Sequence, residues 1–178
     1  MRKTKMILAI SLVANVFMFG MVVSTIRTNG GFHKSTDMIA DLFQSERELT
    51  PWEIMELGLI KVESEGNTQA VSSVGARGVF QITKVYVSEV NRLSDVHNLG
   101  VSYTFDDAFD VAKSFEMFNI MNTYHNNADN EYDRIAVVIK KHNPKAGDWY
   151  SKRVYKAMFE IMTNEQTRSE YIGFLDYV

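Results

Sequence analysis

The residues that could do chemistry in this chain are carboxylates. The 178-residue sequence has no cysteine, which excludes disulfides, thiolate metal sites and a cysteine nucleophile. Its four histidines form neither an H-x-x-H nor an H-E-x-x-H pair, so zinc hydrolysis is disfavoured and we expect no metal. The G-x-S-x-G elbow and the G-x-x-x-x-G-K-[ST] phosphate loop are missing as well. General acid and base chemistry by Asp or Glu is what remains.

One glutamate, Glu63, has the position that such chemistry needs. At ~100° per residue with Trp52 at zero, Leu59 lies at ~340° and Glu63 at ~20°, so Glu63 borders the apolar stripe of a predicted helix. Glu65 points almost the opposite way, because two residues turn a helix by ~200°. A half-buried carboxyl favours its protonated form, which a general acid needs for glycosidic cleavage. The alternative is a glutamate whose stem packs and whose head is solvated.

The elements that must position Glu63 are helices. Thr50-Pro51-Trp52-Glu53 predicts a helix start, in which Thr50 caps, Pro51 fits the first turn and Glu53 completes a capping box. Strands are possible in the serine- and glycine-rich stretch 67–82, but the alternation there is poor. We therefore expect a mostly α domain of packed helical layers. Apolar spacing predicts its further helices at about residues 84–93, 107–125, 131–142 and 149–162.

The first residues of the chain differ from the rest. Arg2, Lys3 and Lys5 give a basic start, and residues 6–26 contain no charged side chain. A helix of that length can cross the ~30 Å hydrocarbon layer at ~1.5 Å per residue. We expect an N-terminal transmembrane anchor over residues 1–27, with a cleaved signal helix as the alternative. By the positive-inside rule, the amino end then stays in the cytoplasm and the chain from Arg27 onward is exported.

Composition sets the remaining boundaries. The Asn-Gly-Gly sequence at residues 29–31 would break a continuing helix, so we interpret residues 28–48 as a tether. The helical domain would span residues 49–163. The tail, residues 164–178, would pack back on that domain or dock a partner. The net charge of -3 gives no basic surplus, so we expect no nucleic-acid partner.

The stretch 63–82 carries a more specific signal. Its sequence, ESEGNTQAVSSVGARGVFQI, resembles the catalytic segment of the soluble lytic transglycosylase (SLT) family, which is related to goose-type lysozyme. That family has Glu-Ser, then Ala-Val-Ser, then Gly-Ala-x-Gly-Leu-Met-Gln, and most of these residues recur here at family spacing. Downstream, Lys-His-Asn at residues 141–143 stands where the family has Ala-Tyr-Asn, and Tyr150 opens a Tyr-Ser-Lys-Arg-Val run. The likeness covers roughly residues 49–162.

The resemblance implies a lysozyme-like helical fold and an enzyme that cleaves the β-1,4 bond from N-acetylmuramic acid (MurNAc) to N-acetylglucosamine (GlcNAc). Family members form a 1,6-anhydroMurNAc end without adding water, and Glu63 would be the single catalytic acid and base, with no cofactor. Ordinary glycosidases use two carboxylates, but substrate-assisted enzymes are a recognised exception. Three alternatives stay open: a hydrolytic muramidase, a catalytically inactive wall-binding or scaffold protein, and a membrane-anchored interaction protein without a glycan role.

The resemblance also implies substrate-binding roles, and each has a plainer structural alternative. Ser64 would orient Glu63 or the sugar, or be a helix-terminal hydroxyl. Gln81 would hydrogen-bond the substrate, or be a turn-stabilising amide. Asn143 would hold the acetamido group, or stop a helix before a proline. Tyr150 would place its hydroxyl near Glu63, or pack in the core.

Three further positions complete the predicted site. Gly78 would allow a close backbone approach to the glycan, or serve only a turn. Phe80 replaces the family's methionine and would give a stiffer apolar floor. His142 replaces the family's tyrosine and lies on a predicted core-facing stripe, which favours a satisfied buried histidine over a catalytic or pH-dependent one.

The partners implied are peptidoglycan glycan strands and, through the N-terminal helix, the membrane. We expect an exported protein anchored in the inner membrane and facing the periplasm and cell wall, or a periplasmic or extracellular one if the N-terminal segment is cleaved. Small enzymes of this family often serve secretion machines, conjugation or bacteriophages, and the sequence does not choose among these.

Overall fold

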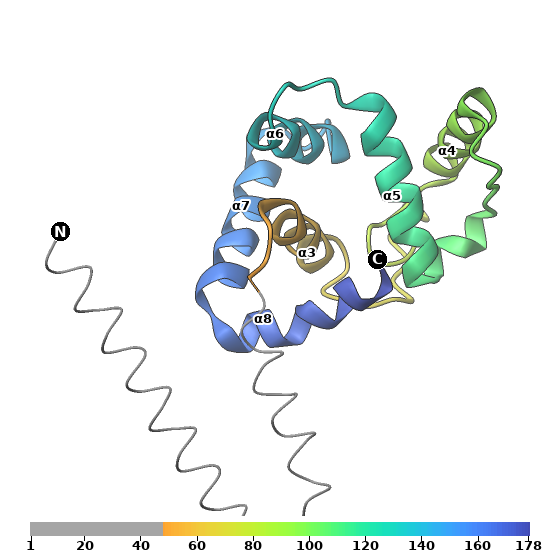
Figure 1. The fold of residues 1–178 in the computed structure, drawn as a ribbon. Coiled ribbons are helices and arrows are strands. Elements are labelled where there is room, and N and C mark those ends of the chain that lie inside the picture. The colour runs from red at the N-terminus through yellow and green to blue at the C-terminus, as the bar shows by residue number, and fades with distance from the viewer. Residues whose placement is uncertain (1–47) are drawn as a thin grey trace, which may run out of the picture. The chain divides into compact units, whose positions relative to one another are not determined.

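The structure is a computed structural model that describes residues 48–178. Helices make up its regular secondary structure. No strand forms among these residues, although Arg77 makes isolated bridges to Val71 and Ile82. The prediction of a mostly α domain is therefore confirmed (Figure 1). The α-helices are α3 (Pro51–Glu63), α4 (Lys84–His97), α5 (Val111–His125), α6 (Glu131–His142), α7 (Asp148–Thr163) and α8 (Glu165–Tyr171), and the 3₁₀ helices are η1 (Phe105–Phe109) and η2 (Ile172–Tyr177).

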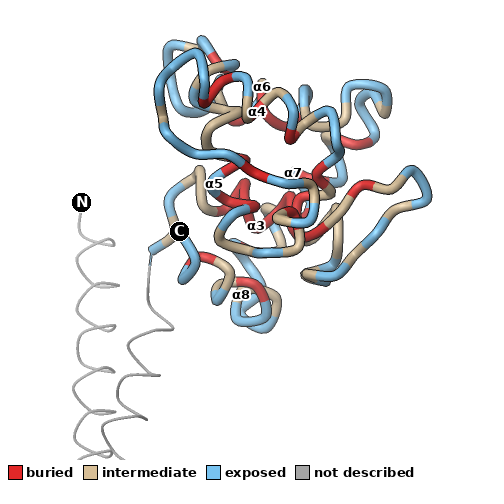
Figure 2. Tube along the Cα trace, turned by 90° about the vertical axis from the view of Figure 1, so that its right-hand side faces the viewer, coloured by how far each residue is buried: buried red, intermediate tan, exposed pale blue. Residues whose placement is uncertain are grey.

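Helix α3 is the central element, with α6, α7 and η2 packed around it (Figure 1). It begins where the sequence predicts, because the Thr50 side chain accepts from the Glu53 N–H at 3.2 Å while the Glu53 carboxylate accepts from the Thr50 N–H at 2.8 Å. Residues 54–60 are all buried, so α3 is covered on every side and not along one stripe. The buried stretches of the neighbouring helices gather around it (Figure 2).

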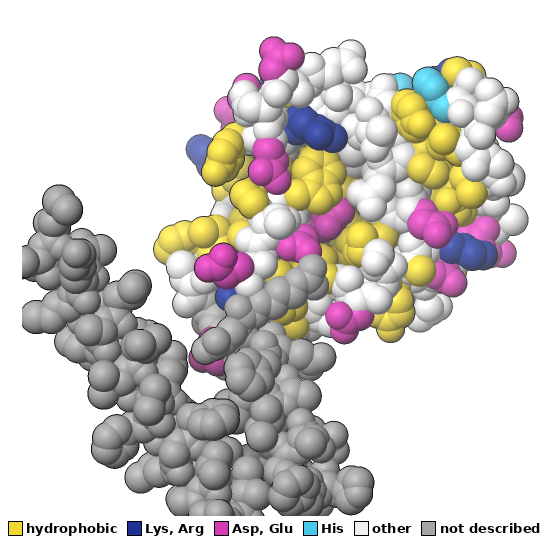
Figure 3. All heavy atoms as spheres, viewed as in Figure 1, with side chains coloured by type: hydrophobic (Ala, Val, Ile, Leu, Met, Phe, Trp, Pro, Cys, Tyr) yellow, Lys and Arg dark blue, Asp and Glu magenta, His cyan; other side chains and the backbone are white. Residues whose placement is uncertain are grey.

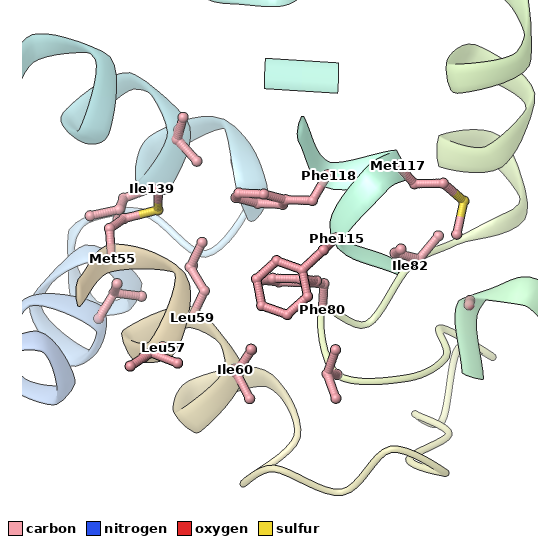
Figure 4. Close-up of a cluster of buried hydrophobic side chains, with 14 of the residues drawn as sticks. Met55, Leu57, Leu59, Ile60, Phe80, Ile82, Phe115, Met117, Phe118 and Ile139 are labelled. Carbon is pink, nitrogen blue, oxygen red and sulfur yellow. The ribbon is translucent and has the colours of Figure 1, made fainter. Parts of the chain in front are cut away.

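Three packed aromatic rings join the loop 67–82 to α5. The Phe80 ring lies parallel to Phe118 with centroids 4.5 Å apart, and meets Phe115 edge-on at 4.9 Å. Figure 4 shows these rings beside Leu59 and Ile60 of α3. Such pairs contribute about 0.5–1.5 kcal/mol beyond their buried area. Phe80, together with the buried Val79 and Ile82, therefore anchors the loop that follows the predicted acid in the core.

The helix predicted over residues 107–125 is divided in two. Asp110 has extended backbone angles, φ -82° and ψ 121°, and its carboxylate accepts from the Lys113 N–H at 3.1 Å. This cap ends η1 and starts α5, because an N-cap residue cannot itself be helical. By contrast, α6 has the predicted bounds, and α4 continues four residues beyond its predicted end, to His97.

The C-terminal tail packs on the domain. Helices α8 and η2 were not predicted, yet Tyr171 and Leu175 are only 7% and 5% exposed and belong to the hydrophobic core. One compact unit therefore runs from Leu49 to Val178.

The predicted anchor over residues 1–27, and the tether up to residue 47, lie outside the described residues. From Glu48 onward, no helix combines the length and the apolar character needed to cross a membrane.

Candidate active site

Three predicted site residues from three helices meet at the end of α3. Glu63 is the last residue of α3, and 15% of its side chain is exposed. The Tyr150 hydroxyl, on α7, donates a hydrogen bond to Glu63 Oε1. His142, the last residue of α6, brings its Nε2 to 3.7 Å from the same oxygen. Oε2 has no hydrogen bond from residues 48–178, so this oxygen is left for a ligand.

Tyr150 is a fixed hydrogen-bond donor to Glu63. The residue is 2% exposed. Burial raises the pKa of the Tyr150 hydroxyl far above its ordinary value of 10, and the negative charge of Glu63 raises this pKa further. The phenol therefore keeps its proton at any physiological pH. Its ring also lies nearly parallel to that of His142, with 10° between the planes.

His142 is a neutral, hydrogen-bonded histidine. Its Nε2 lies 3.1 Å from the Phe80 carbonyl oxygen, and because a carbonyl only accepts, this nitrogen carries the proton. Burial lowers the pKa of His142 below its ordinary value of 6.5, although Glu63 and the Phe80 carbonyl oppose that effect. At neutral pH its contact with Glu63 is therefore not an ion pair. His142 therefore has the surroundings of a buried histidine whose hydrogen-bonding need is met within the protein, as its position on the core-facing stripe favours.

Phe80 and Gly78 act beneath the site. The Phe80 ring has no exposed surface, so a direct contact with a substrate, as implied by the resemblance, is not available to it. Gly78 has φ +70°, and a Cβ there would lie 1.7 Å from the Ala108 carbonyl oxygen. The close approach that this glycine permits is to the chain itself, at η1, and not to a glycan.

Ser64 ties the loop 67–82 to α3, and Gln81 braces that loop internally. The Ser64 hydroxyl lies 3.0 Å from the Val79 carbonyl oxygen and 3.1 Å from that of Ile60. The Gln81 amide donates to the Gly78 carbonyl at 2.9 Å, and Gln81 has a left-handed backbone with φ +50°. Ser64 thus makes the bonds of a helix-terminal hydroxyl, and Gln81 makes the bonds of a turn-stabilising amide.

Asn143 is the one amide residue of the predicted site whose side chain has no hydrogen-bond partner in residues 48–178. It is the C-cap of α6, with φ -134° and ψ 73°, so it does end the helix before Pro144. Its side chain is partly exposed and leaves both polar atoms for a ligand.

Sequence reasoning missed a second buried acid, Glu56. It is 2% exposed, and the Trp52 indole donates to its Oε1 at 2.9 Å. Burial raises the pKa of Glu56 from 4.5 to about 7. The spacing contained the signal, because Glu56 comes seven residues before Glu63 and so lies within ~20° of it around the helix. Groups of three acidic or histidine side chains that could hold a metal do not occur in the described part of the chain.

Fold and site together define a class of protein: a helical domain with one half-buried acid at a helix end, held by a phenol. That is an arrangement suited to general acid chemistry. The model of the transglycosylase SLT domain matches residues 43–140, more than half of the chain, and the chain belongs to that family. No curated protein and no solved structure gives a significant match. The matched segment includes Glu63 and Gln81 and ends two residues before His142.

Family membership supports a peptidoglycan-acting function of the lytic transglycosylase type in general.

Proposed function

We propose that this protein is a peptidoglycan lytic transglycosylase in which Glu63 is the single acid and base. The observation that supports the proposal best is the contact between the Tyr150 hydroxyl and Glu63 Oε1 at a carboxyl with 15% of its side chain exposed. This contact orients the carboxyl and leaves its other oxygen to meet a substrate.

In the first step, protonated Glu63 gives its proton to the glycosidic oxygen between MurNAc and GlcNAc. The bond from C1 of MurNAc to that oxygen breaks, and the GlcNAc end leaves as an alcohol. The positive charge that develops at C1 is stabilised by the substrate's own acetamido group. We assign the holding of that acetamido group to Asn143, whose side-chain amide has no hydrogen-bond partner within the described residues.

In the second step, Glu63 acts as the base. It removes the proton from the C6 hydroxyl of the same MurNAc, and the C6 oxygen forms a bond to C1. The product is a 1,6-anhydroMurNAc end, no water is consumed, and Glu63 returns to its protonated state. One residue thus serves as acid and then base.

The surroundings of Glu63 suit a mechanism with one carboxylate. Within residues 48–178 its polar partners are Tyr150 and His142, and neither is an acid. Glu56 is shut in the core, about 10 Å away along the helix at ~1.5 Å per residue. Glu65 follows the helix end with φ +53° and lines a different hollow with Lys61. Mechanisms with two carboxylates need separations of about 5–9.5 Å across the bond that is cut.

We also propose that the protein is exported and held in the membrane by residues 1–27, so that the domain faces the cell wall. The uncharged run 6–26 behind a basic start supports this localisation. Alkaline extraction of membranes tests it, since an anchored chain stays in the pellet and a cleaved one is released.

Mass spectrometry of digested peptidoglycan tests the proposed reaction. The full chain should produce 1,6-anhydroMurNAc ends, and Glu63→Gln should produce none. Reducing MurNAc ends would show a muramidase. An absence of any cleavage by the wild-type protein, together with sedimentation on peptidoglycan, would show a wall-binding protein.

A further inference from the structure

A polar hollow of about 420 Å³ lies where α3, α7 and α8 meet. This volume equals that of about a dozen waters at ~30 Å³ each. A short peptide fragment has a similar volume. Acidic and basic side chains are interspersed with hydrophobic ones over the face of the molecule drawn in Figure 3. Six side chains give the hollow its chemistry: Lys61, Glu65, Arg153, Lys156, Glu160 and Tyr171.

The cations of this hollow exceed its acids. Lys61 and Lys156 share one carboxylate, because each ammonium nitrogen lies 3.8 Å from an oxygen of Glu160. Such long, solvated pairs bind weakly and exchange easily. Arg153 has no carboxylate partner in the described part of the chain, and its guanidinium lies over the Trp149 ring at 5.6 Å.

The hollow adjoins the candidate acid. Arg153 comes one helical turn after Tyr150 on α7, and its positive charge acts to lower the pKa of that hydroxyl. Val62, the residue before Glu63, lines the hollow as well. Glu63 itself does not line the hollow, so a group bound there would belong to a part of the substrate that extends away from the bond to be cut.

We propose that this hollow binds a carboxylate of the peptide stem carried by the MurNAc unit, with Arg153 and Lys156 as its main contacts. The inference rests on the proposed function, since it concerns a second part of the same substrate. A stem peptide is joined to MurNAc by an amide bond to the lactyl carboxyl and bears free carboxylates of its own farther along the peptide. A guanidinium without a carboxylate partner is suited to bind one.

Kinetics on two forms of one substrate test this site. Glycan strands with intact stems are compared with the same strands after an amidase has removed the stems, which leaves only the lactyl carboxylate on each MurNAc, so a difference in KM reports the carboxylates farther along the stem. The full chain should show a lower KM for strands with stems. Arg153→Gln and Lys156→Gln should each reduce that preference by about two- to fivefold, the range expected for one exposed ion pair. Lys152→Gln is the matched control, because Lys152 is exposed on α7 outside the hollow.

The outcomes separate this inference from the proposed function. A preference for stems that falls in both variants, remains in Lys152→Gln and weakens with added salt supports the site. Equal KM values for the two substrates in the wild-type protein would overturn the stem site while leaving the transglycosylase proposal standing. The same holds if neither variant changes the preference. Failure to cleave either substrate would instead remove the proposed function.

Discussion

Two glutamates on one face of α3 have opposite surroundings. Glu56 is 2% exposed, hydrogen-bonded to Trp52, and has its pKa raised to about 7. Glu63, seven residues later, keeps 15% of its side chain exposed and meets Tyr150 and His142 at the end of the helix. A perturbed carboxyl pKa alone would point to Glu56 as the functional acid. Burial that complete leaves a substrate no path to Glu56, whereas Glu63 is partly exposed, and this contrast supports the proposal that Glu63 is the acid.

The difference comes from position along the helix and not from its face. Glu56 lies in the middle of the buried stretch 54–60, where packing closes over it. Glu63 lies where α3 ends and the loop 67–82 begins, so part of it remains open. A helix end gives a carboxyl both a protein partner and access to ligand.

The largest expected effect contrasts the two acids directly. Glu63→Gln should lower kcat on peptidoglycan by about 10²- to 10⁴-fold, because the proton donor is lost. Glu56→Gln should retain activity within about threefold, since a closed core residue makes no transition-state contact. Turbidity clearance measures both. Comparable losses of kcat in the two variants would contradict the assignment of the acid role to Glu63 alone.

The second effect concerns stability against pH. The pKa of Glu56 rises from 4.5 to about 7 on folding, so the folded state holds this proton more tightly. The resulting stabilisation is complete below pH 4.5 and is lost as the pH rises through about 7. Relative to Glu56→Gln, the wild-type unfolding free energy should fall by about 3 kcal/mol across this window, at ~1.4 kcal/mol per pKa unit.

Urea denaturation of the wild type and Glu56→Gln at pH 4, 5.5, 7 and 8.5 gives the comparison. Curves that stay parallel at every pH would mean that Glu56 does not titrate in this window.

The third effect concerns the phenol that holds Glu63. Tyr150→Phe should lower kcat about 10- to 100-fold, because a hydrogen bond to a charged group contributes about 1.5–3 kcal/mol. Tyr155→Phe on the same helix is the control, since Tyr155 is exposed. An unchanged kcat for Tyr150→Phe would assign Tyr150 to core packing alone.

The smallest effect concerns Ser64, next to Glu63. Ser64→Ala should lower the free energy of unfolding by about 1 kcal/mol through loss of the bond to the Val79 carbonyl, with KM unchanged. Ser88→Ala is the matched control, because its hydroxyl bonds only within its own helix, to the Lys84 carbonyl. A raised KM at unchanged stability would return Ser64 to a sugar-binding role.

Local signals predicted much of this molecule. The capping box at Thr50 and the bounds of α6 follow from residues a few positions apart, and both are as predicted. The motif at residues 63–82 indicated the family, which the match over residues 43–140 confirms. Glu63 was placed at the edge of an apolar stripe from spacing alone.

Contacts between distant segments were not predictable from the sequence. His142 bonds to the Phe80 carbonyl, 62 positions away, and Gly78 is required by the Ala108 carbonyl of another element. Glu56 lay on the same stripe as Glu63, but its burial depends on the helices packed around α3. Side-chain spacing shows which face a residue occupies, while depth depends on tertiary packing.

A crystal structure of the Glu63→Gln variant with a MurNAc–GlcNAc oligosaccharide tests most directly whether a glycosidic oxygen is bound at Glu63. We expect the bridging oxygen within about 3.2 Å of the amide at position 63, with the MurNAc acetamido group on Asn143. An oligosaccharide bound elsewhere, with position 63 facing empty solvent, would show that Glu63 is not the acid.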